Sequence, residues 1–176
     1  MGTIKSLLNY RGKSFLERAI LLYGNFCQEI LIPLGYGGNL IKENIKGLGF
    51  EFLESQSYEE GMGGTLREAV LDLGSCDFFF VTLCDLPLVK KETLAELLKV
   101  AYKNQKAIVP VYHGKKGHPV LFPVKMIEDF AELKGDLGAK KILTDDNTLL
   151  VSVEDEGVVT DIDTPEAYHQ LGGEND

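Results

Sequence analysis

The sequence predicts an α/β fold in which a mostly parallel β-sheet lies between two layers of helices. Short apolar runs typical of strands alternate with amphipathic helical patterns along most of the chain, as in repeated strand–helix–strand units. The run "DFFFVTL" at Asp77–Leu83 is apolar on both faces, as a strand covered by helices on both sides is. The 176 residues are enough for one domain with its own core.

The first part of the chain supplies strands and helices in alternation. In order, the pattern predicts a helix at 14–22, a strand at 29–34, a turn at 35–39, a strand at 49–55, a helix at 64–73, a strand at 77–83, a helix at 91–104 and a strand at 106–112. Apolar residues three and four positions apart define the helices, and apolar–polar alternation or short apolar runs define the strands. Thr65 with Glu68 three residues later predicts a capping box for the helix at 64–73.

The pattern changes after Tyr112. It predicts, in order, a hairpin or excursion from the sheet at 113–123, helices at 124–133 and 138–145, a strand at 148–154, and a strand that runs into a last helix at 157–171. Thr164 is the expected N-cap of that helix, and Pro165 fits its first turn.

Composition excludes several classes of protein. The net charge of −9 argues against a nucleic-acid or anionic-membrane surface, which needs clustered Lys and Arg. No apolar run reaches the length of a membrane span, and no secretory signal opens the sequence. The three cysteines are widely spaced and form no CxxC pair, so we expect reduced thiols in a cytoplasmic protein, without a disulfide framework or a zinc site.

The strand at 77–83 raises the main chemical question. It is followed by Asp85, with Pro87 two residues later, and a core strand has no need of a carboxylate at its tip. In α/β sheets, ligands bind beyond the carboxyl ends of the parallel strands. Carboxylate oxygens are the ligands that Mg²⁺ prefers. The sequence therefore predicts a magnesium ligand at Asp85, and a turn aspartate before proline is the structural alternative.

A second pair of carboxylates lies near the end of the chain. Asp161 and Asp163 flank Ile162, so on an extended backbone both side chains point to the same side. One of them, preferably Asp163, could complete the metal site while the other braces a neighbour. The alternative is a role at the start of the last helix, where the helix dipole stabilises aspartate.

Six sequence blocks, spread over the whole chain in order, resemble one known family. They are "MGTIKSLLNYRGKSFLERAI", "YEEGMGGTLREAV", "CDLPLV", "KKGHPVLF", "KGDLGAKKIL" and "DIDTPEAY". Together these blocks resemble the MobA-like nucleotidyltransferases, and G-H-P with D-I-D-T-P-E is similar to the molybdenum cofactor cytidylyltransferase branch. The resemblance implies a three-layer α/β/α, Rossmann-like, mostly parallel sheet of the nucleotidyltransferase type, formed by one domain over residues 1–176.

The resemblance also implies a reaction, in which CMP passes from CTP to a molybdopterin-type cofactor with release of pyrophosphate and with Mg²⁺ as the metal. The implied catalytic residues are Asp85, Asp163 and Lys5, and the implied metal ligands are Asp85, Asp163 and Asp161. The implied nucleotide-binding residues are Gly2, Lys5, Gly61, Thr65, Leu83 and Asp85. The implied acceptor-binding residues are His118, Gly117, Gly135 and Asp136.

Most of these positions also have an ordinary structural reading. Lys5 could be a surface lysine. His118 alone, in a turn, carries little information. The stretch from Gly61 to Thr65 could present N–H groups to an anion at a helix N-terminus, or simply begin a capped helix. Gly135 and Asp136 could shape the acceptor pocket or cap the next helix.

One departure from the family pattern concerns the first strand. Members of the family carry a strand and a glycine-rich loop, L-A-A-G-x-S-x-R, directly ahead of M-G-x-x-K, and Met1 stands at the M of that block. The resemblance therefore implies a domain that lacks the family's first strand. This departure leaves two alternatives open: a degenerate module that binds the cofactor and inserts it into a molybdenum hydroxylase, or a nucleotidyltransferase for another phosphorylated acceptor, by guanylyl transfer or on a sugar phosphate.

Overall fold

The computed structural model describes residues 4–35, 37–47, 49–136 and 138–172. Its strands are β1 (Asn9–Tyr10), β2 (Lys13–Ser14), β3 (Leu31–Leu34), β4 (Glu51–Glu54), β5 (Phe78–Val81), β6 (Ala107–Tyr112), β7 (Lys115–Lys116), β8 (Val120–Pro123) and β9 (Thr148–Ser152). Its α-helices are α1 (Phe15–Tyr23), α2 (Gly38–Asn44), α3 (Met62–Leu71), α4 (Lys91–Asn104) and α5 (Pro165–Gln170). Short 3₁₀ helices are η1 (Lys5–Leu7), η2 (Tyr58–Glu60), η3 (Val124–Glu132), η4 (Ala139–Lys141) and η5 (Glu156–Val159).

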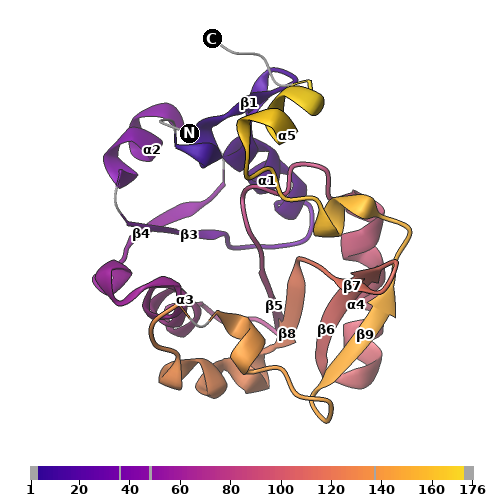
Figure 1. Ribbon diagram of the computed structural model, residues 1–176. Helices are drawn as coiled ribbons and strands as arrows, with labels where there is room; N and C mark the ends of the chain where they lie inside the picture. Colours follow the sequence, from indigo (N-terminus) through magenta and orange to yellow (C-terminus); the bar gives the residue numbers. More distant parts are fainter. Residues whose placement is uncertain (1–3, 36, 48, 137, 173–176) are drawn as a thin grey trace.

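The described strands form three sheets (Figure 1). β1 and β2 make a small antiparallel hairpin, β3 and β4 make a parallel pair, and five strands run in the order β5-β8-β6-β7 with β9 also on β6. Within the five-stranded sheet only β6 and β9 are parallel. The prediction of a mostly parallel sheet is therefore wrong. The sheet is mixed because β8, which follows the excursion after β6, lies antiparallel between β5 and β6.

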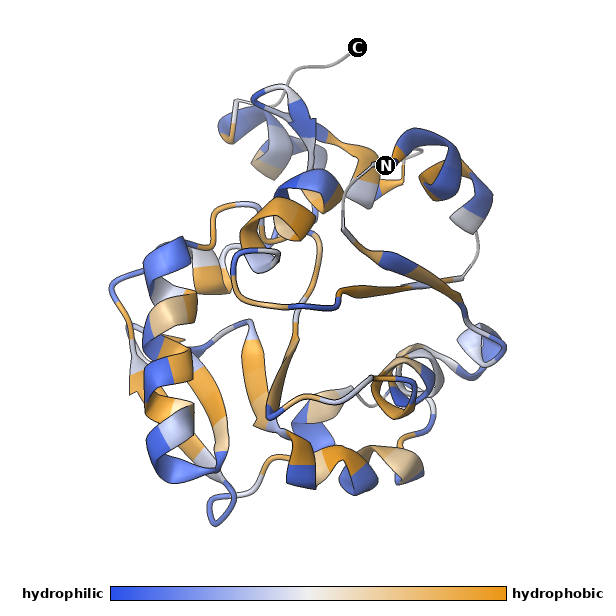
Figure 2. Ribbon diagram, turned by 180° about the vertical axis from the view of Figure 1, so that it is seen from behind, coloured by the Kyte–Doolittle hydropathy of each residue, from blue (hydrophilic) through white to orange (hydrophobic). Residues whose placement is uncertain are grey.

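The five-stranded sheet is covered on both faces, as three layers require. In β8, Leu121 packs with α4 residues such as Leu97 on one face, whereas Phe122 packs with Phe130 of η3 on the other. In β5, Phe79 belongs to the cluster around η3 and α3. Figure 2 shows these strands as predominantly hydrophobic, while the helices keep hydrophilic outer faces. The apolar run "DFFFVTL" was thus correctly interpreted as a strand covered on both sides.

A strand with two apolar faces is typical of the centre of a parallel sheet, but β5 does not lie at the centre of its sheet. β5 forms ladders only with β8 among the described strands, so it lies at an edge of its sheet and is antiparallel to its neighbour. The parallel pair β3–β4 lies nearby as a separate sheet (Figure 1). Edge position explains why three of the four β5 residues are only partly buried.

Helix ends follow the local sequence where a capping side chain is present. Ser14 caps α1 in a capping box with Glu17. Thr164 caps α5, with Pro165 in the first turn, which confirms that prediction. The prediction of a capping box at Thr65 is wrong, because α3 begins at Met62 and its N-cap is Gly61.

The second half of the chain is less helical than predicted. The helix predicted at 124–133 is the 3₁₀ helix η3, which ends at Glu132, and 138–145 contain only η4. The predicted strand at the start of 157–171 is absent from that described stretch, and η5 occupies its beginning. The apolar spacing of η3 buries Met126 and Phe130 all the same, so the periodicity located the buried face but not the helix type.

Candidate active site

The loop after β5 places Asp85 beside the amino-terminal segment. The side chain of Asp85 is 17% exposed, and its Oδ2 lies 3.8 Å from Nζ of Lys5. The same ammonium group donates a hydrogen bond to Oδ1 of Asp163, near the other end of the chain. The structure therefore brings together Lys5, Asp85 and Asp163, as the sequence predicted, although the strand that carries Asp85 is an edge strand.

Charge and burial perturb all three groups. Burial raises the pKa of Asp85, against the opposing effects of a backbone hydrogen bond and of Lys5, and the nearby Asp163 and Asp161 raise it further. The hydrogen bond from Lys5 lowers the pKa of Asp163, and a side-chain hydrogen bond with Asp161 adds to this effect. The hydrogen bond to Asp163 also raises the pKa of Lys5.

Backbone contacts fix the segment that carries the second carboxylate pair. The N–H of Ile162 donates to the carbonyl oxygen of Asp85 at 3.0 Å. This bond ties the middle of the Asp161–Asp163 segment to the loop after β5. The two carboxylate-bearing stretches therefore meet through main-chain geometry as well as through Lys5.

The buried Asp155 anchors the chain ahead of the Asp161–Asp163 segment to the start of α4. This residue was not identified from the sequence. It is 1% exposed, and its Oδ2 accepts from the N–H of Lys90 at 2.8 Å and from Oγ1 of Thr93 at 2.6 Å. Its Oδ1 accepts from the N–H of Gly157 at 3.0 Å. A carboxylate from residue 155 therefore caps the start of α4. A long-range cap leaves no local sequence signal.

His118 lies against this cluster. Burial lowers the pKa of the His118 imidazole, while nearby Asp85 and a backbone bond at Val81 oppose the shift. Its Nδ1 is buried with no partner among the described residues. The N–H of His118 donates to the carbonyl of Val158 at 2.8 Å, and a Cβ on Gly117 would lie 2.2 Å from that same carbonyl oxygen. A side chain at position 117 would therefore clash with the backbone that holds His118 in place, so this position requires glycine.

A second cluster forms around the N-terminus of α3. A Cβ on Gly61 would lie 2.6 Å from Oδ1 of Asp136 and 2.8 Å from the carbonyl carbon of Gly135. The N–H of Gly63 donates to the carbonyl of Gly135 at 2.7 Å. The structure thus joins Gly61, predicted to bind nucleotide, with Gly135 and Asp136, predicted to bind the acceptor. Thr65 lies one turn into α3 and accepts a hydrogen bond from Ser55 at 3.5 Å.

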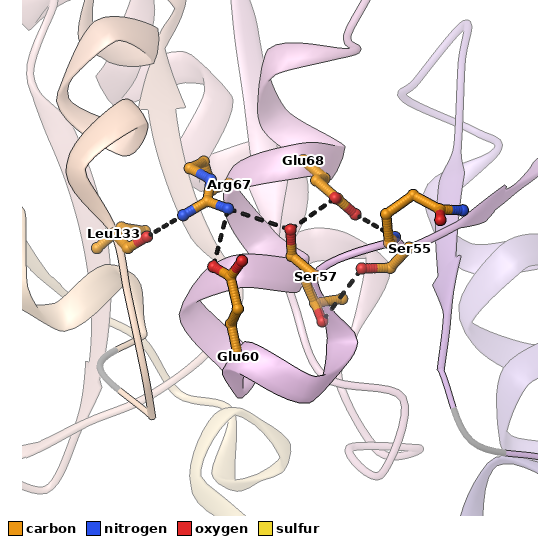
Figure 3. Close-up of polar contacts among 8 residues, drawn as sticks. Ser55, Ser57, Glu60, Arg67, Glu68 and Leu133 are labelled. Atoms are coloured by element: carbon orange, nitrogen blue, oxygen red, sulfur yellow. Dashed lines mark hydrogen bonds and ion pairs between the residues drawn. The ribbon is translucent and has the colours of Figure 1, made fainter.

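Arg67 holds this second cluster together (Figure 3). Its guanidinium donates to the carbonyl of Leu133 at 2.9 Å, to Oγ of Ser57 at 3.1 Å and to Oε2 of Glu60 at 3.0 Å. Figure 3 shows Glu68 completing the network, and its Oε1 accepts from Ser57 at 2.7 Å. The network ties the turn before Gly61 to the loop before Gly135. Glu68 therefore serves this turn instead of the capping box predicted for it.

Two predicted residues stand apart from these contacts. Leu83 is 39% exposed in the loop between β5 and Asp85. Gly2 lies outside the described residues. Among the residues that the structure describes, no hydrogen bond or ion pair links the carboxylate cluster to the cluster around Gly61, so the predicted residues fall into two groups.

The carboxylate cluster supplies some, but not all, of the ligands that a hard divalent cation needs. In the described part of the chain, no three or more His, Cys, Asp or Glu side chains form a metal-binding group. Two carboxylates are enough for Mg²⁺ when phosphate and water oxygens supply the other positions. Oδ1 of Asp85 is buried without a partner among the described residues, which is the free oxygen that such an ion needs. The residues present therefore fit a cation that arrives with a phosphate ligand.

Comparison with solved structures defines the class of the fold. The crystal structure of Rv0371c from Mycobacterium tuberculosis H37Rv has a TM-score of 0.80 at 22% identity and covers 97% of this chain and 89% of that chain. The 2-C-methyl-D-erythritol 4-phosphate cytidylyltransferase from Thermus thermophilus has a TM-score of 0.73 at 19% identity, covering 95% and 91%. The chain therefore has an α/β fold of the nucleotidyltransferase type, with a mixed sheet.

The family follows from the sequence match. Residues 1–150 match the model of the MobA-like NTP transferase domain, and the chain belongs to this family of nucleotidyltransferases. It is similar to the molybdenum cofactor cytidylyltransferase of Escherichia coli (strain K12), with 23% identity over 96% of this chain and 86% of that protein. It is also similar to the probable molybdenum cofactor guanylyltransferase of Bacillus cereus (strain Q1), with 27% identity over 65% and 57%. The predicted family is confirmed.

The remaining sequence predictions concern membrane spans, the cysteines and the metal. No described helix combines the length and the apolar character that a membrane crossing would need. All three cysteines are free thiols. A second structure of Rv0371c was solved as a complex with manganese; it has a TM-score of 0.74 at 22% identity and covers 95% of this chain and 90% of that chain.

Proposed function

We propose that this chain transfers a cytidylyl group from CTP to a phosphorylated acceptor of the molybdopterin type. The observation that carries this proposal is the cluster of Lys5, Asp85 and Asp163. These residues come from three distant parts of the chain, and both carboxylates lie at the ammonium group of Lys5. The similarity to a cytidylyltransferase over 96% of the chain supports the choice of nucleotide.

In the proposed reaction, an oxygen of the acceptor's terminal phosphate forms a bond to the α-phosphorus of CTP. The bond between the α-phosphorus and the bridging oxygen to the β-phosphate breaks, and pyrophosphate leaves with that electron pair. The reaction requires alignment of two polyanions and neutralisation of their charge. Lys5 would bind a triphosphate oxygen as a point charge.

Asp85 and Asp163 would hold Mg²⁺, with Asp161 bracing Asp163. The metal supplies the positive charge that a protein of net charge −9 lacks near the phosphates. The buried, unpartnered Oδ1 of Asp85 supports this role. A neutral imidazole at His118, favoured by burial, would hydrogen-bond the acceptor, beside the close-packed Gly117.

The second cluster would contact the far ends of the substrates. Gly61 and Thr65 at the start of α3 would bind the nucleotide, together with Gly2 and Leu83. The loop at Gly135 and Asp136 would bind the acceptor. The direct packing of Gly61 against this loop supports an arrangement in which this cluster contacts both substrates away from the reacting phosphates.

Guanylyl transfer is the second candidate function, because guanylyltransferases are also among the similar proteins. The experiment incubates the purified chain with a molybdopterin-type acceptor, either CTP or GTP, and either Mg²⁺ or Mn²⁺, and measures pyrophosphate release. We expect release with CTP and Mg²⁺. Release with GTP alone would move the proposal to guanylyl transfer, and binding of the acceptor without turnover of any nucleotide would favour a cofactor carrier for a molybdenum hydroxylase.

The decisive variant is Asp85→Asn, which keeps the size of the side chain and removes its charge. We expect pyrophosphate release to fall about 100-fold or more, with a nearly unchanged thermal midpoint, because Asp85 contributes charge and little packing. Asp77→Asn is the matched control, since Asp77 is an exposed carboxylate at the opposite end of β5. Wild-type turnover in Asp85→Asn would refute the assigned role.

A further inference from the structure

The second cluster contains two chain segments that pack directly on each other. One is the segment at 57–63, which includes η2 and enters α3, and the other is the loop at 133–136, which follows η3. The N–H of Gly63 donates to the carbonyl oxygen of Gly135 at 2.7 Å. A Cβ on Gly61 would lie 2.8 Å from the carbonyl carbon of Gly135, so the two backbones leave no room for a side chain between them. A displacement of one segment therefore disturbs the other.

Arg67 bridges the two segments from within α3. Its Nη1 donates to the carbonyl oxygen of Leu133 at 2.9 Å, while its Nη2 donates to Oγ of Ser57 at 3.1 Å and to Oε2 of Glu60 at 3.0 Å. Figure 3 shows the guanidinium group between these partners. The Arg67 side chain is only 19% exposed, so these bonds are largely shielded from water and are stronger than they would be at an open surface. One rigid group thus fixes both segments at once.

Outside these contacts both segments are open to solvent. The side chains at 58–60 are exposed, and so are residues 134–136. Gly61 has a φ of 90° and Gly135 a φ of 64°, and glycine at such positions adds backbone freedom in the disordered state. Segments with few buried contacts open easily. A ligand that must order such a segment binds more weakly than it would bind to an ordered one.

We propose that Arg67 is a positioning residue that couples the two substrates, because it makes the segment at 57–63 and the loop at 133–136 order together. This inference rests on the proposed function, in which the start of α3 binds the nucleotide and the loop binds the acceptor. The second substrate then meets a segment that the first has already ordered, so each substrate raises the affinity of the other. The two factors are equal by thermodynamic linkage, and we expect them to be about fivefold or more.

Two variants separate the bridge from the charge. Arg67→Met removes all three hydrogen bonds and keeps an apolar stem. Arg67→Lys keeps the charge, but its single nitrogen cannot replace two nitrogens that bind Leu133 on one side and Ser57 and Glu60 on the other. Lys103→Met is the matched control, because it removes one exposed cation from α4, which lies on the other face of the sheet from η3.

The first measurement is calorimetric titration of the α,β-methylene analogue of CTP with Mg²⁺, in the presence and absence of a molybdopterin-type acceptor. A methylene group replaces the bridging oxygen, so pyrophosphate cannot leave and affinities are measured without turnover. In the wild-type protein and in Lys103→Met, we expect the acceptor to tighten binding of the analogue by about fivefold or more. In Arg67→Met and Arg67→Lys this factor should fall to about one.

Amide hydrogen exchange is the second measurement. In the wild-type protein, the CTP analogue alone should slow exchange in the loop at 133–136 as well as in the segment at 57–63. In Arg67→Met the protection at 57–63 should remain and the protection of the loop should be lost. Circular dichroism checks that the variants fold; if neither variant at Arg67 folds, the exchange pattern of the wild-type protein decides.

Three outcomes would overturn the proposal. Binding of both ligands to the wild-type protein without any mutual effect would refute the coupling and leave the proposed function intact. An unchanged coupling factor in Arg67→Met, even with weaker binding of each ligand alone, would show that Arg67 has a purely structural role. Failure of the wild-type protein to bind either ligand would refute the proposed function itself, and the coupling with it.

Discussion

Replacement of the buried Asp155 by alanine is the sharpest test of how the candidate site is positioned. The Asp155 carboxylate accepts three hydrogen bonds, from Lys90, Thr93 and Gly157, at 2.6–3.0 Å. Asp155→Ala removes all three and leaves a buried hydroxyl and two backbone N–H groups without an acceptor. It also releases the chain that leads to Asp161 and Asp163 from the start of α4.

The magnitude follows from these contacts. A hydrogen bond to a charged group contributes about 1.5–3 kcal/mol, and a buried donor left unpaired costs about 1–3 kcal/mol. The N–H of Lys90 lies at a partly exposed position, so water can replace its partner at least in part. We expect a loss of about 3–5 kcal/mol in the free energy of unfolding. This is a large share of the roughly 5–15 kcal/mol that a domain has.

The measurement is urea unfolding followed by circular dichroism, with Glu154→Ala as the control. Glu154 is exposed, and its backbone carbonyl accepts from Nζ of Lys90 at 3.0 Å. Truncation of its side chain leaves that bond in place, so the variant should change stability by less than about 0.5 kcal/mol. If Asp155→Ala still folds, pyrophosphate release should fall as well, because the segment that leads to Asp163 loses one of the contacts that position it. A loss of stability below about 1 kcal/mol would refute the reasoning.

Three further predictions concern other parts of the structure. Gly117→Ala places a Cβ 2.2 Å from a backbone oxygen of Val158 and should lower the thermal midpoint, with a cost of about 2 kcal/mol or more; Gly49→Ala, which meets nothing within 4 Å, should not. Arg67→Ala should speed amide exchange in the turn before α3, and unchanged exchange would show that its network is dispensable. Burial raises the pKa of the Cys27 thiol from 9.0 to about 11, so the folded state holds its proton longer and stability should fall as pH rises from 9.0 toward 11; in Cys27→Ala this alkaline loss of the thermal midpoint should be smaller, and an identical loss would contradict the assignment.

Local sequence predicted the elements whose formation depends on local interactions. The amphipathic spacing of α1 and α4, the Thr164–Pro165 start of α5 and the apolar run of β5 are all found where the pattern placed them, to within a few residues. Asp85 was singled out because it follows an apolar strand, and the Asp161–Asp163 pair because both side chains lie on one side of an extended segment. The structure then places them around one lysine.

The errors arise where distant contacts decide the outcome. Thr65 and Glu68 have the spacing of a capping box, but Glu68 instead accepts from Ser57, so α3 starts at Met62. Residues of η3 have helical spacing, yet they form a 3₁₀ helix over the sheet.

The sequence by itself determined the family, the order of most elements and the carboxylates of the candidate site, because these depend on residue types at fixed spacings. Only the tertiary structure decided the pairing of the strands, with β8 antiparallel between β5 and β6 and an apolar cavity between β3 and β5. It alone decided that Asp155 supports the start of α4 and that Gly61 packs on Gly135. The physical reason is that hydrogen bonds and close packing between residues far apart in the chain leave no periodic trace in the sequence.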